Sequence, residues 1–185
     1  MPRQERDRRQ EKTRSALVHA FRDLIVERRF DEIGVADIAA RAQVSRSTLY
    51  QHFAGKSGLL AASIAVPFAR LAATLGDEEN TADLPSLLEH FWGNRALARV
   101  LFFGGTRHKV MAVLVDQIER SLKSRGYAKR GRLILPVRLA AVLLAEILLA
   151  PVAAWLAGDS HCTAEALAHG LRQVGRGALA SLLAV

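Results

Sequence analysis

The sequence VADIAARAQVSRSTLYQHF at residues 35–53 decides the fold, because two short helical patterns meet in it across a three-residue break. In the first pattern, apolar or small side chains recur at helical spacing and define one packing face: Val35, Ile38, Ala39 and Ala42. The break covers residues 43–45, and a second helical pattern follows it directly. Two short helices joined by so tight a turn predict a helix-turn-helix.

The ends of both helices carry suitable residues. Asp37 in the first turn and Arg41 in the last turn complement the helix dipole of the first helix. Ser45 predicts the N-cap of the second helix, since its hydroxyl can accept a backbone N–H two or three residues further on. The second helix should therefore begin at Arg46.

The second helix has a buried side and a polar side. Leu49 and Phe53 are four residues apart and should point inward, which leaves polar side chains on the outer face. Such a helix fits the major groove of DNA, where its side chains can read base edges. Arg46 suits guanine, Gln51 suits adenine and the Thr48 methyl suits thymine, at about 1–3 kcal/mol of discrimination for each good bidentate pair.

Other side chains in this region suit the DNA backbone. Tyr50, His52 and Lys56 can reach phosphate oxygens, which position a protein without reading sequence. Lys56 also opens the next helix, whose free N–H groups attract a phosphate. The complete set of candidate DNA contacts is Ala36, Ser45, Arg46, Ser47, Thr48, Tyr50, Gln51, His52 and Lys56.

The stretch 11–71 resembles the N-terminal domain of the TetR/AcrR (tetracycline-repressor) family of bacterial transcription regulators. The residues that carry the resemblance are Gly34, Asp37, Ile38, Ala39, Ala42, Gln43, Val44, Ser45, Thr48, Leu49, Tyr50, His52, Phe53, Lys56 and Leu59. The resemblance implies an all-α protein with a three-helix DNA-binding domain at 11–71, its motif at 34–53. A helical effector-binding and dimerisation domain would follow at 77–185.

Two positions depart from the family pattern. Gly34 stands where a hydroxyl usually caps the first motif helix, which should cost only a few tenths of a kcal/mol. Gln43 stands where the family commonly has glycine, and a left-handed Gln costs on the order of 1–2 kcal/mol. Neither penalty is large enough to abolish the motif, but the two departures leave open which DNA sequence the protein prefers in each half-site.

Charge agrees with a polyanionic partner. The 185-residue chain has a formal net charge of +8, and half of its residues are apolar. Residues 1–10 form a basic stretch that is either a flexible arm reaching the DNA or a solvated tail. A second basic cluster should be solvated surface, with an acidic partner as the alternative: Arg120, Lys123, Arg125, Lys129, Arg130, Arg132 and Arg138.

Several features bear on location and cofactors. Cys162 is the single cysteine, so no intrachain disulfide is expected and a reducing compartment is indicated. No metal-ligand spacing predicts a metal or cofactor, and the charged N-terminus predicts no secretory signal. Residues 139–157 approach the length of a membrane span, but they contain Glu146 and Pro151, so a buried helix is preferred. The expected location is the bacterial cytoplasm, in association with the nucleoid.

Helix breakers divide the rest of the chain. A polar break at 76–83 is the expected domain boundary, and 126–135 should be a basic loop. Pro67 should bend the helix that contains it. The expected helices outside the motif are 11–27, 56–75, 84–93, 95–103, 106–125, 136–156 and 163–183.

The resemblance also implies a dimer through the last two helices. Small residues on the final helix would permit close approach of a second copy, with high alanine content as the less favoured explanation: Ala166, Gly170, Gly177 and Ala178. A twofold pair presents two reading helices about 34–36 Å apart, one helical turn of DNA. A palindromic operator is therefore expected.

The family places a small-molecule cavity among the helices after the DNA-binding domain. The candidate lining residues are Phe68, Leu88, Phe91, Trp92, Phe102, Phe103, Met111, Leu114, Glu146 and Trp155, with His90 and Arg99 as further polar anchors. For each apolar member taken singly, plain core packing is preferred to a place in the cavity wall. A carboxylate in the apolar run around Glu146 must be paired, protonated or exposed to a polar cavity. Both a cationic effector and an ion pair with an arginine satisfy that requirement.

The sequence therefore predicts a homodimeric transcriptional regulator, in the first place a repressor that a small-molecule effector releases from DNA. A DNA-binding protein of chromosome organisation is the nearest alternative, and it would occupy many dispersed sites rather than a few palindromes. A small helical enzyme is disfavoured, because Cys162 and the scattered histidines form no catalytic pattern.

Overall fold

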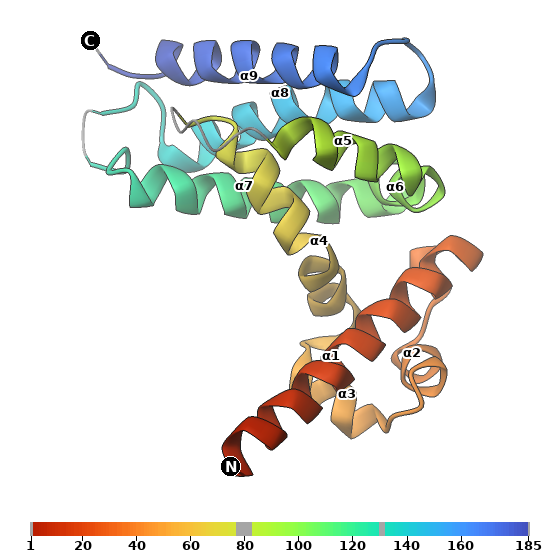
Figure 1. Ribbon diagram of the computed structural model, residues 1–185. Coiled ribbons are helices and arrows are strands. Elements are labelled where there is room, and N and C mark those ends of the chain that lie inside the picture. Colours follow the sequence, from red (N-terminus) through yellow and green to blue (C-terminus); the bar gives the residue numbers. More distant parts are fainter. Residues whose placement is uncertain (1, 77–82, 130–131, 185) are drawn as a thin grey trace. The chain divides into compact units, whose positions relative to one another are not determined.

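The computed structural model describes residues 2–76, 83–129 and 132–184, and these are helical with no β-strand among them. An isolated antiparallel bridge joins Leu133 to Leu183. The chain divides into two compact units, Met1–Ile64 and Ala65–Val185 (Figure 1). The predicted all-α fold is confirmed.

The first unit is built on one long helix. It contains α1 (Pro2–Glu27), the short 3₁₀ turn η1 (Phe30–Glu32), α2 (Val35–Arg41), α3 (Arg46–His52) and the beginning of α4 (Gly55–Ala73). The core of this unit consists of side chains that are at most 5% exposed: Leu17, Phe21, Leu24, Ile25, Phe30, Ile33, Ile38, Leu49, Phe53, Leu59 and Leu60. Phe21 and Phe30 meet edge to face with ring centroids 6.2 Å apart. Burial of this set fixes α2 and α3 relative to α1.

The N-terminal stretch differs from the prediction of a flexible arm. Helix α1 begins at Pro2 rather than near residue 11, so residues 2–10 extend it. Proline is favourable in a first helical turn, because its missing N–H has no partner there in any case. Glu5 and Arg9 lie one turn apart with 3.9 Å between their charged atoms, and both are exposed. The basic stretch is thus presented on a helix.

The second unit contains the remainder of α4 and all later helices. These are α5 (Leu84–Gly93), α6 (Arg95–Phe102), the 3₁₀ turn η3 (Gly104–Thr106), α7 (Arg107–Ser124), α8 (Val137–Ala157) and α9 (Ala164–Ser181). Helix α8 packs against both α7 and α9 (Figure 1). Gly175 is buried on α9, and a Cβ there would lie 3.0 Å from Leu75 and 3.5 Å from Leu148. Gly175 thus allows close packing of α9 within the chain, and the sequence analysis did not single it out.

Helix α8 is the core helix of this unit. Ten of its residues are buried, including Leu144, Leu148 and Leu156. Helices α4 and α8 are both long and apolar enough to cross a membrane by length and composition alone, with 33% and 56% of their most apolar windows buried. The burial of α8 agrees with the preferred prediction of a buried helix.

Most helix ends lie within a few residues of their predicted positions. Thr163 caps α9 by accepting the Ala166 N–H at 3.2 Å, and Gly158 ends α8 in the left-handed conformation with φ 90°. Thr106 precedes α7 but does not cap it with its side chain, because its hydroxyl faces the carbonyl oxygens of Val100 at 2.5 Å and of Leu101 and Phe103 at 3.1 Å.

The boundary between the units also differs from expectation. The predicted boundary at 76–83 lies largely outside the described residues. Within this stretch, the structure describes only residues 76 and 83. The compact units instead divide between Ile64 and Ala65, within α4. Pro67 stands inside that helix, as predicted.

Candidate nucleic-acid interface

The first motif helix, α2, is held at both ends by charged side chains. The Asp37 carboxylate accepts the N–H of Gly34 at 2.8 Å, so the glycine cap is supported by a side chain from the first turn. At the other end, Arg41 donates two hydrogen bonds of 2.9 and 2.8 Å to Glu27, the last residue of α1. The hydrogen bonds from Arg41 lower the pKa of Glu27, so this carboxylate stays ionised.

The turn between the motif helices has the predicted backbone. Gln43 has φ 56°, the left-handed conformation that the family pattern assigns to this position. It is the only residue other than glycine with positive φ in the described part of the chain. The next residue, Val44, donates its N–H to Ala39 at 2.9 Å and closes the turn.

The second motif helix, α3, begins where the sequence predicts. The Ser45 hydroxyl accepts the Thr48 N–H at 3.0 Å, which confirms the N-cap and the start at Arg46. The same hydroxyl lies 2.7 Å from the Ser47 hydroxyl and 2.8 Å from the Thr48 hydroxyl. Three predicted contact residues thus form one hydroxyl cluster, in which Ser45 also caps the helix.

The two sides of α3 differ as predicted. Leu49 is fully buried and Phe53, the C-cap, is 5% exposed. On the other side, Arg46, Tyr50 and Gln51 are exposed, Tyr50 by 61%. Among the residues that the structure describes, these three side chains have no hydrogen-bond or ion-pair partner. Thr48 and His52 are half-buried at the edges of this face, and so is Ala36 in the first turn of α2.

Lys56 has a different role from the predicted phosphate contact. Its ammonium donates to the carbonyl oxygens of Phe30 at 2.8 Å, Ile33 at 3.0 Å and Asp31 at 3.3 Å. The same ammonium lies 4.6 Å from the centroid of the Phe30 ring. An ammonium has three N–H donors, and here they bind the loop between α1 and α2. The assignment of Lys56 to a DNA phosphate is therefore revised to a structural one.

Arg14 makes a contact with the Phe53 ring that the sequence analysis did not predict. Its guanidinium lies 4.8 Å from the centroid of the Phe53 ring, so α1 is joined to the end of α3 by a cation–π contact. The position is exposed. The helical spacing of Arg14 with Leu17 and Phe21 does not predict this contact, because the contact depends on where the end of α3 lies in space.

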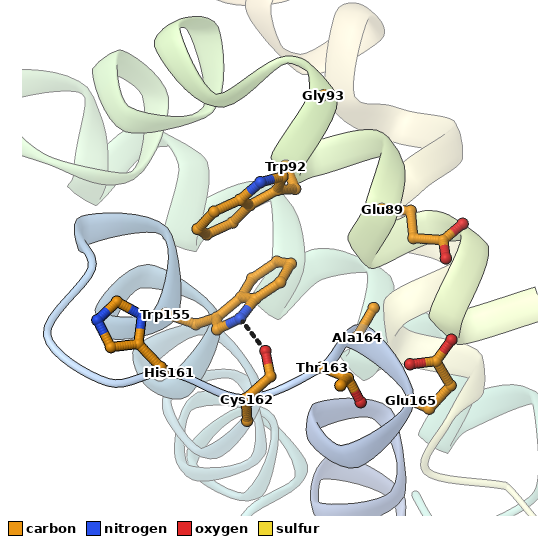
Figure 2. Close-up of a pocket in the computed structure, with 9 residues that line it drawn as sticks. All are labelled: Glu89, Trp92, Gly93, Trp155, His161, Cys162, Thr163, Ala164 and Glu165. Atoms are coloured by element: carbon orange, nitrogen blue, oxygen red, sulfur yellow. Dashed lines mark hydrogen bonds between the residues drawn. The ribbon is translucent and has the colours of Figure 1, made fainter.

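The apolar residues expected to line an effector site include a buried set and a pair that lines a cavity, both in the second unit. Phe68, Leu88, Phe91, Phe102 and Leu114 are buried core, with ring centroids of Phe91 and Phe102 5.5 Å apart and those of Phe68 and Phe102 6.0 Å apart. These side chains pack against one another in the core. Trp92 and Trp155, in contrast, line a cavity of about 500 Å³ (Figure 2).

The remaining members of the expected set lie elsewhere. Met111 is half-buried, Phe103 is 38% exposed, and His90 and Arg99 are exposed. Glu146 pairs with Arg107, whose Nη2 lies 2.8 Å from the carboxylate, and this bond raises the pKa of Arg107. Of the alternatives left open for Glu146, the ion pair with an arginine is the one observed.

The second basic cluster is partly neutralised within the chain. Arg138 donates to Glu119 at 2.8 Å and to Asp116, and Lys123 lies 2.7 Å from Glu119. Hydrogen bonds from Lys123 and Arg138 lower the pKa of Glu119. Arg130 lies outside the described residues. Of this cluster, Lys123 and Arg138 therefore belong to an ion-pair network with Asp116 and Glu119.

Comparison with known proteins places the motif in a family. The family described as "Bacterial regulatory proteins, tetR family" matches residues 17–63. An uncharacterized HTH-type transcriptional regulator of Bacillus subtilis (strain 168), YxbF, is 33% identical over 96 residues, which are 51% of this chain and 24% of that protein. This chain thus matches about a quarter of the length of its curated relative.

Solved structures share the fold over nearly the whole chain. A TetR transcriptional regulator from Streptococcus agalactiae 2603V has a TM-score of 0.61 at 23% identity, covering 93% of this chain and 98% of that one. NalD of Pseudomonas aeruginosa, described as the secondary repressor of the MexAB-OprM multidrug efflux pump, has a TM-score of 0.55 at 22% identity, covering 94% and 97%. Residues 17–63 are thus similar to the tetR family of bacterial regulatory proteins, and the chain shares its fold with these solved structures.

Proposed function

We propose that this protein is a sequence-specific DNA-binding transcriptional regulator, acting as a homodimeric repressor that a small molecule releases from a palindromic operator. The observation that carries the proposal is the outer face of α3. Arg46, Tyr50 and Gln51 are exposed there without a partner in the described parts of the chain, while Leu49 anchors the opposite face. A helix with free donors and acceptors on a fixed base is suited to the major groove.

Individual contacts follow from the chemistry of this face. Arg46 reads a guanine edge, Gln51 an adenine edge and the Thr48 methyl a thymine. Tyr50 and His52 bind phosphates and set the register. Ser47 stands beside them, and Ser45 and Ala36 lie at the starts of the two motif helices. Lys56 is not kept among the DNA contacts, because its ammonium already binds three carbonyl groups.

Dimerisation is supported by an exposed apolar surface on the last two helices. A groove of about 330 Å³ is lined by Ile147, Pro151, Cys162, Ala166, Leu167, Gly170, Leu171 and Val174. Further exposed apolar side chains on α8 are Leu139, Val142 and Leu143, between 37% and 53% exposed. A contiguous apolar surface of this kind marks a protein interface. Of the small residues expected to allow close approach, Ala166 and Gly170 line this groove.

Release by a ligand requires two states of the protein with different affinity for DNA. In the second state the two α3 helices of the dimer would be separated by a different distance. A ligand that binds this state more tightly than the DNA-binding state would weaken operator binding by the difference between its two binding free energies, typically about 1–3 kcal/mol. Helix α4 runs through the division between the two units and is the element through which we propose this coupling. The site of action is the bacterial cytoplasm, on the nucleoid.

Selection of bound DNA from a random pool tests the proposal. Wild-type protein should select two inverted half-sites, and Arg46→Ala should lose the preference at one base in each half-site while keeping the others. Arg120→Ala is the matched control, because Arg120 is an exposed arginine on α7 in the other unit. A pool without any enriched sequence would contradict the proposal and favour a role in chromosome organisation, and equal selection by Arg46→Ala would remove the assigned contact.

A further inference from the structure

A cavity of about 500 Å³ lies in the second unit, among residues that the DNA-reading surface does not use (Figure 2). Its wall comes from the end of α5, from Trp155 near the end of α8, and from residues 161–165 at the start of α9. Its volume falls within the roughly 300–1,000 Å³ of small-molecule sites. The cavity is large enough for an organic molecule of moderate size.

Two indoles form one wall of the cavity. The rings of Trp92 and Trp155 have centroids 4.7 Å apart and are tilted by 40° (Figure 2). Trp155 is 7% exposed and donates its Nε1–H to the Cys162 carbonyl at 3.0 Å, which fixes both the ring and the loop before α9. Trp92 remains 40% exposed, an unusual loss of apolar burial for so large a side chain.

One cation of the protein already uses this aromatic wall. The Arg95 guanidinium lies 4.5 Å from the centroid of the Trp92 ring. Its N–H groups donate to the Leu156 carbonyl at 2.8 Å and the Ala157 carbonyl at 3.3 Å, at the end of α8. Arg95 is therefore held by α8 and is not among the residues that line the cavity. This cation–π contact covers one face of the Trp92 ring.

Apart from the His161 imidazole, the charged side chains of the described lining are both acidic. Two carboxylates, Glu89 and Glu165, line the cavity, and no lysine or arginine is among its described lining residues. This is the reverse of the whole chain, whose net charge is +8. The backbone N–H of Glu165 and the Thr163 hydroxyl lower the pKa of Glu165, so that carboxylate is ionised. Figure 2 shows Glu89 and Glu165 on the same side of the cavity.

We propose that this cavity binds a small organic cation with an apolar body. The cationic group would lie between Glu89 and Glu165, and the apolar body would lie against Trp92 and Trp155. Aromatic rings and carboxylates together favour an organic cation over a neutral or anionic molecule of the same shape. Binding of the cation stands on the cavity alone, whereas its use as the effector of DNA release rests on the proposed function.

Tryptophan fluorescence of the full chain gives a direct test, because the only two tryptophans of the protein both line the cavity. The probes are three molecules with one apolar body: 4-tert-butylbenzyltrimethylammonium, 4-tert-butylbenzyl alcohol and 4-tert-butylbenzoate. The ammonium should change the emission in a saturable titration, with an affinity at least about tenfold above that of the alcohol and no saturation by the benzoate. Calorimetry with the same three probes measures binding independently of the emission.

Charge removal at the cavity provides the matched variants. Glu89→Gln and Glu165→Gln keep the shape of the wall, and each should weaken binding of the ammonium by about fivefold to tenfold while leaving the alcohol unchanged. Asp116→Asn removes a carboxylate on α7 that does not line the cavity and should leave the ammonium affinity unchanged. Equal affinity for ammonium and alcohol, or unchanged affinity in both glutamine variants, would overturn the proposal.

The two proposals fail separately. If the ammonium binds the cavity but does not alter the affinity for selected operator DNA, the cation site stands and its role as the effector site is wrong. If operator DNA is selected normally but none of the probes binds in calorimetry, the cation site is wrong and the DNA-binding function stands.

Discussion

The two units use polar side chains in different ways. In the first unit, polar groups position the reading surface: Lys56 holds the loop before α2, Asp37 supports the start of α2 and the exposed Ser45 caps α3. In the second unit, α8 is fixed by apolar burial, and ion pairs such as Arg107–Glu146 lie at its partly exposed edge. We therefore expect loss of a polar group to lower the free energy of unfolding more near the motif than between α7 and α8.

Lys56→Met should give the largest effect. The variant keeps the alkyl chain but leaves three carbonyl groups without their donor, at an expected cost of about 2 kcal/mol in the free energy of unfolding. Urea unfolding followed by circular dichroism measures this cost. Lys12→Met, at an exposed position on α1, is the control and should stay within about 0.5 kcal/mol of wild type.

The same variant separates the structural role of Lys56 from the phosphate role that the sequence suggests. Under conditions where Lys56→Met is folded, the salt dependence of DNA binding should have the wild-type slope. A slope reduced by about one, with unchanged stability, would return Lys56 to the phosphate contacts.

Ser45→Ala should give the next largest effect. Loss of the hydroxyl that accepts the Thr48 N–H should cost about 1 kcal/mol of stability, as for other N-caps. Ser47→Ala is a suitable control, because that hydroxyl contacts Ser45 but accepts no backbone N–H of α3. Unfolding by urea compares the two, and an equal loss in both would assign the effect to the hydroxyl cluster rather than to the cap.

Gln43→Gly should stabilise the motif. The left-handed backbone costs Gln about 1–2 kcal/mol, and the greater freedom of glycine in the unfolded chain offsets about half of this. The expected gain is about 0.5–1 kcal/mol, measured as a rise in the urea midpoint. Gln43→Ala keeps the strain and should give no gain. A destabilised glycine variant would show that the turn carries no strain.

The Arg107–Glu146 pair should give the smallest effect. Both side chains are 40–45% exposed, so the coupling free energy in a double-mutant cycle of Arg107→Gln and Glu146→Gln should be below about 1 kcal/mol. The coupling should decline further in 1 M salt, which screens exposed charges. Both tryptophans lie in this unit, so their fluorescence follows its unfolding. A coupling free energy as large as the effect of Lys56→Met would contradict the expectation that polar groups contribute more to stability in the first unit than in the second.

The sequence predicted the motif well because its signals are local. A serine cap acts within three residues, and a left-handed turn position is set by its immediate neighbours, so Ser45 and Gln43 behave as expected. The partners of Lys56 and Arg14 lie in other elements, and a sequence pattern does not specify which carbonyl or ring will be nearest. The sequence therefore contained no sign that the Lys56 ammonium binds the carbonyl groups of the loop before α2.

The second unit shows the same limit more strongly. Helical spacing predicted most helix ends and the burial of α8, because burial follows the periodicity of apolar residues. The same spacing treated Phe91 and Trp92 alike, although Phe91 packs in the core and Trp92 borders a cavity. Which aromatic residue faces a cavity depends on long-range packing between α5, α8 and the start of α9.

Cys162 has a practical consequence for measuring this molecule. It is the single cysteine of the chain, it is exposed, and it lies in the short connection between α8 and α9. A nitroxide or a fluorescent dye can therefore be attached at one defined place without removing any other thiol. Because Cys162 also lines the apolar groove proposed as the dimer interface, an environment-sensitive dye attached to it would report directly on whether that groove becomes covered.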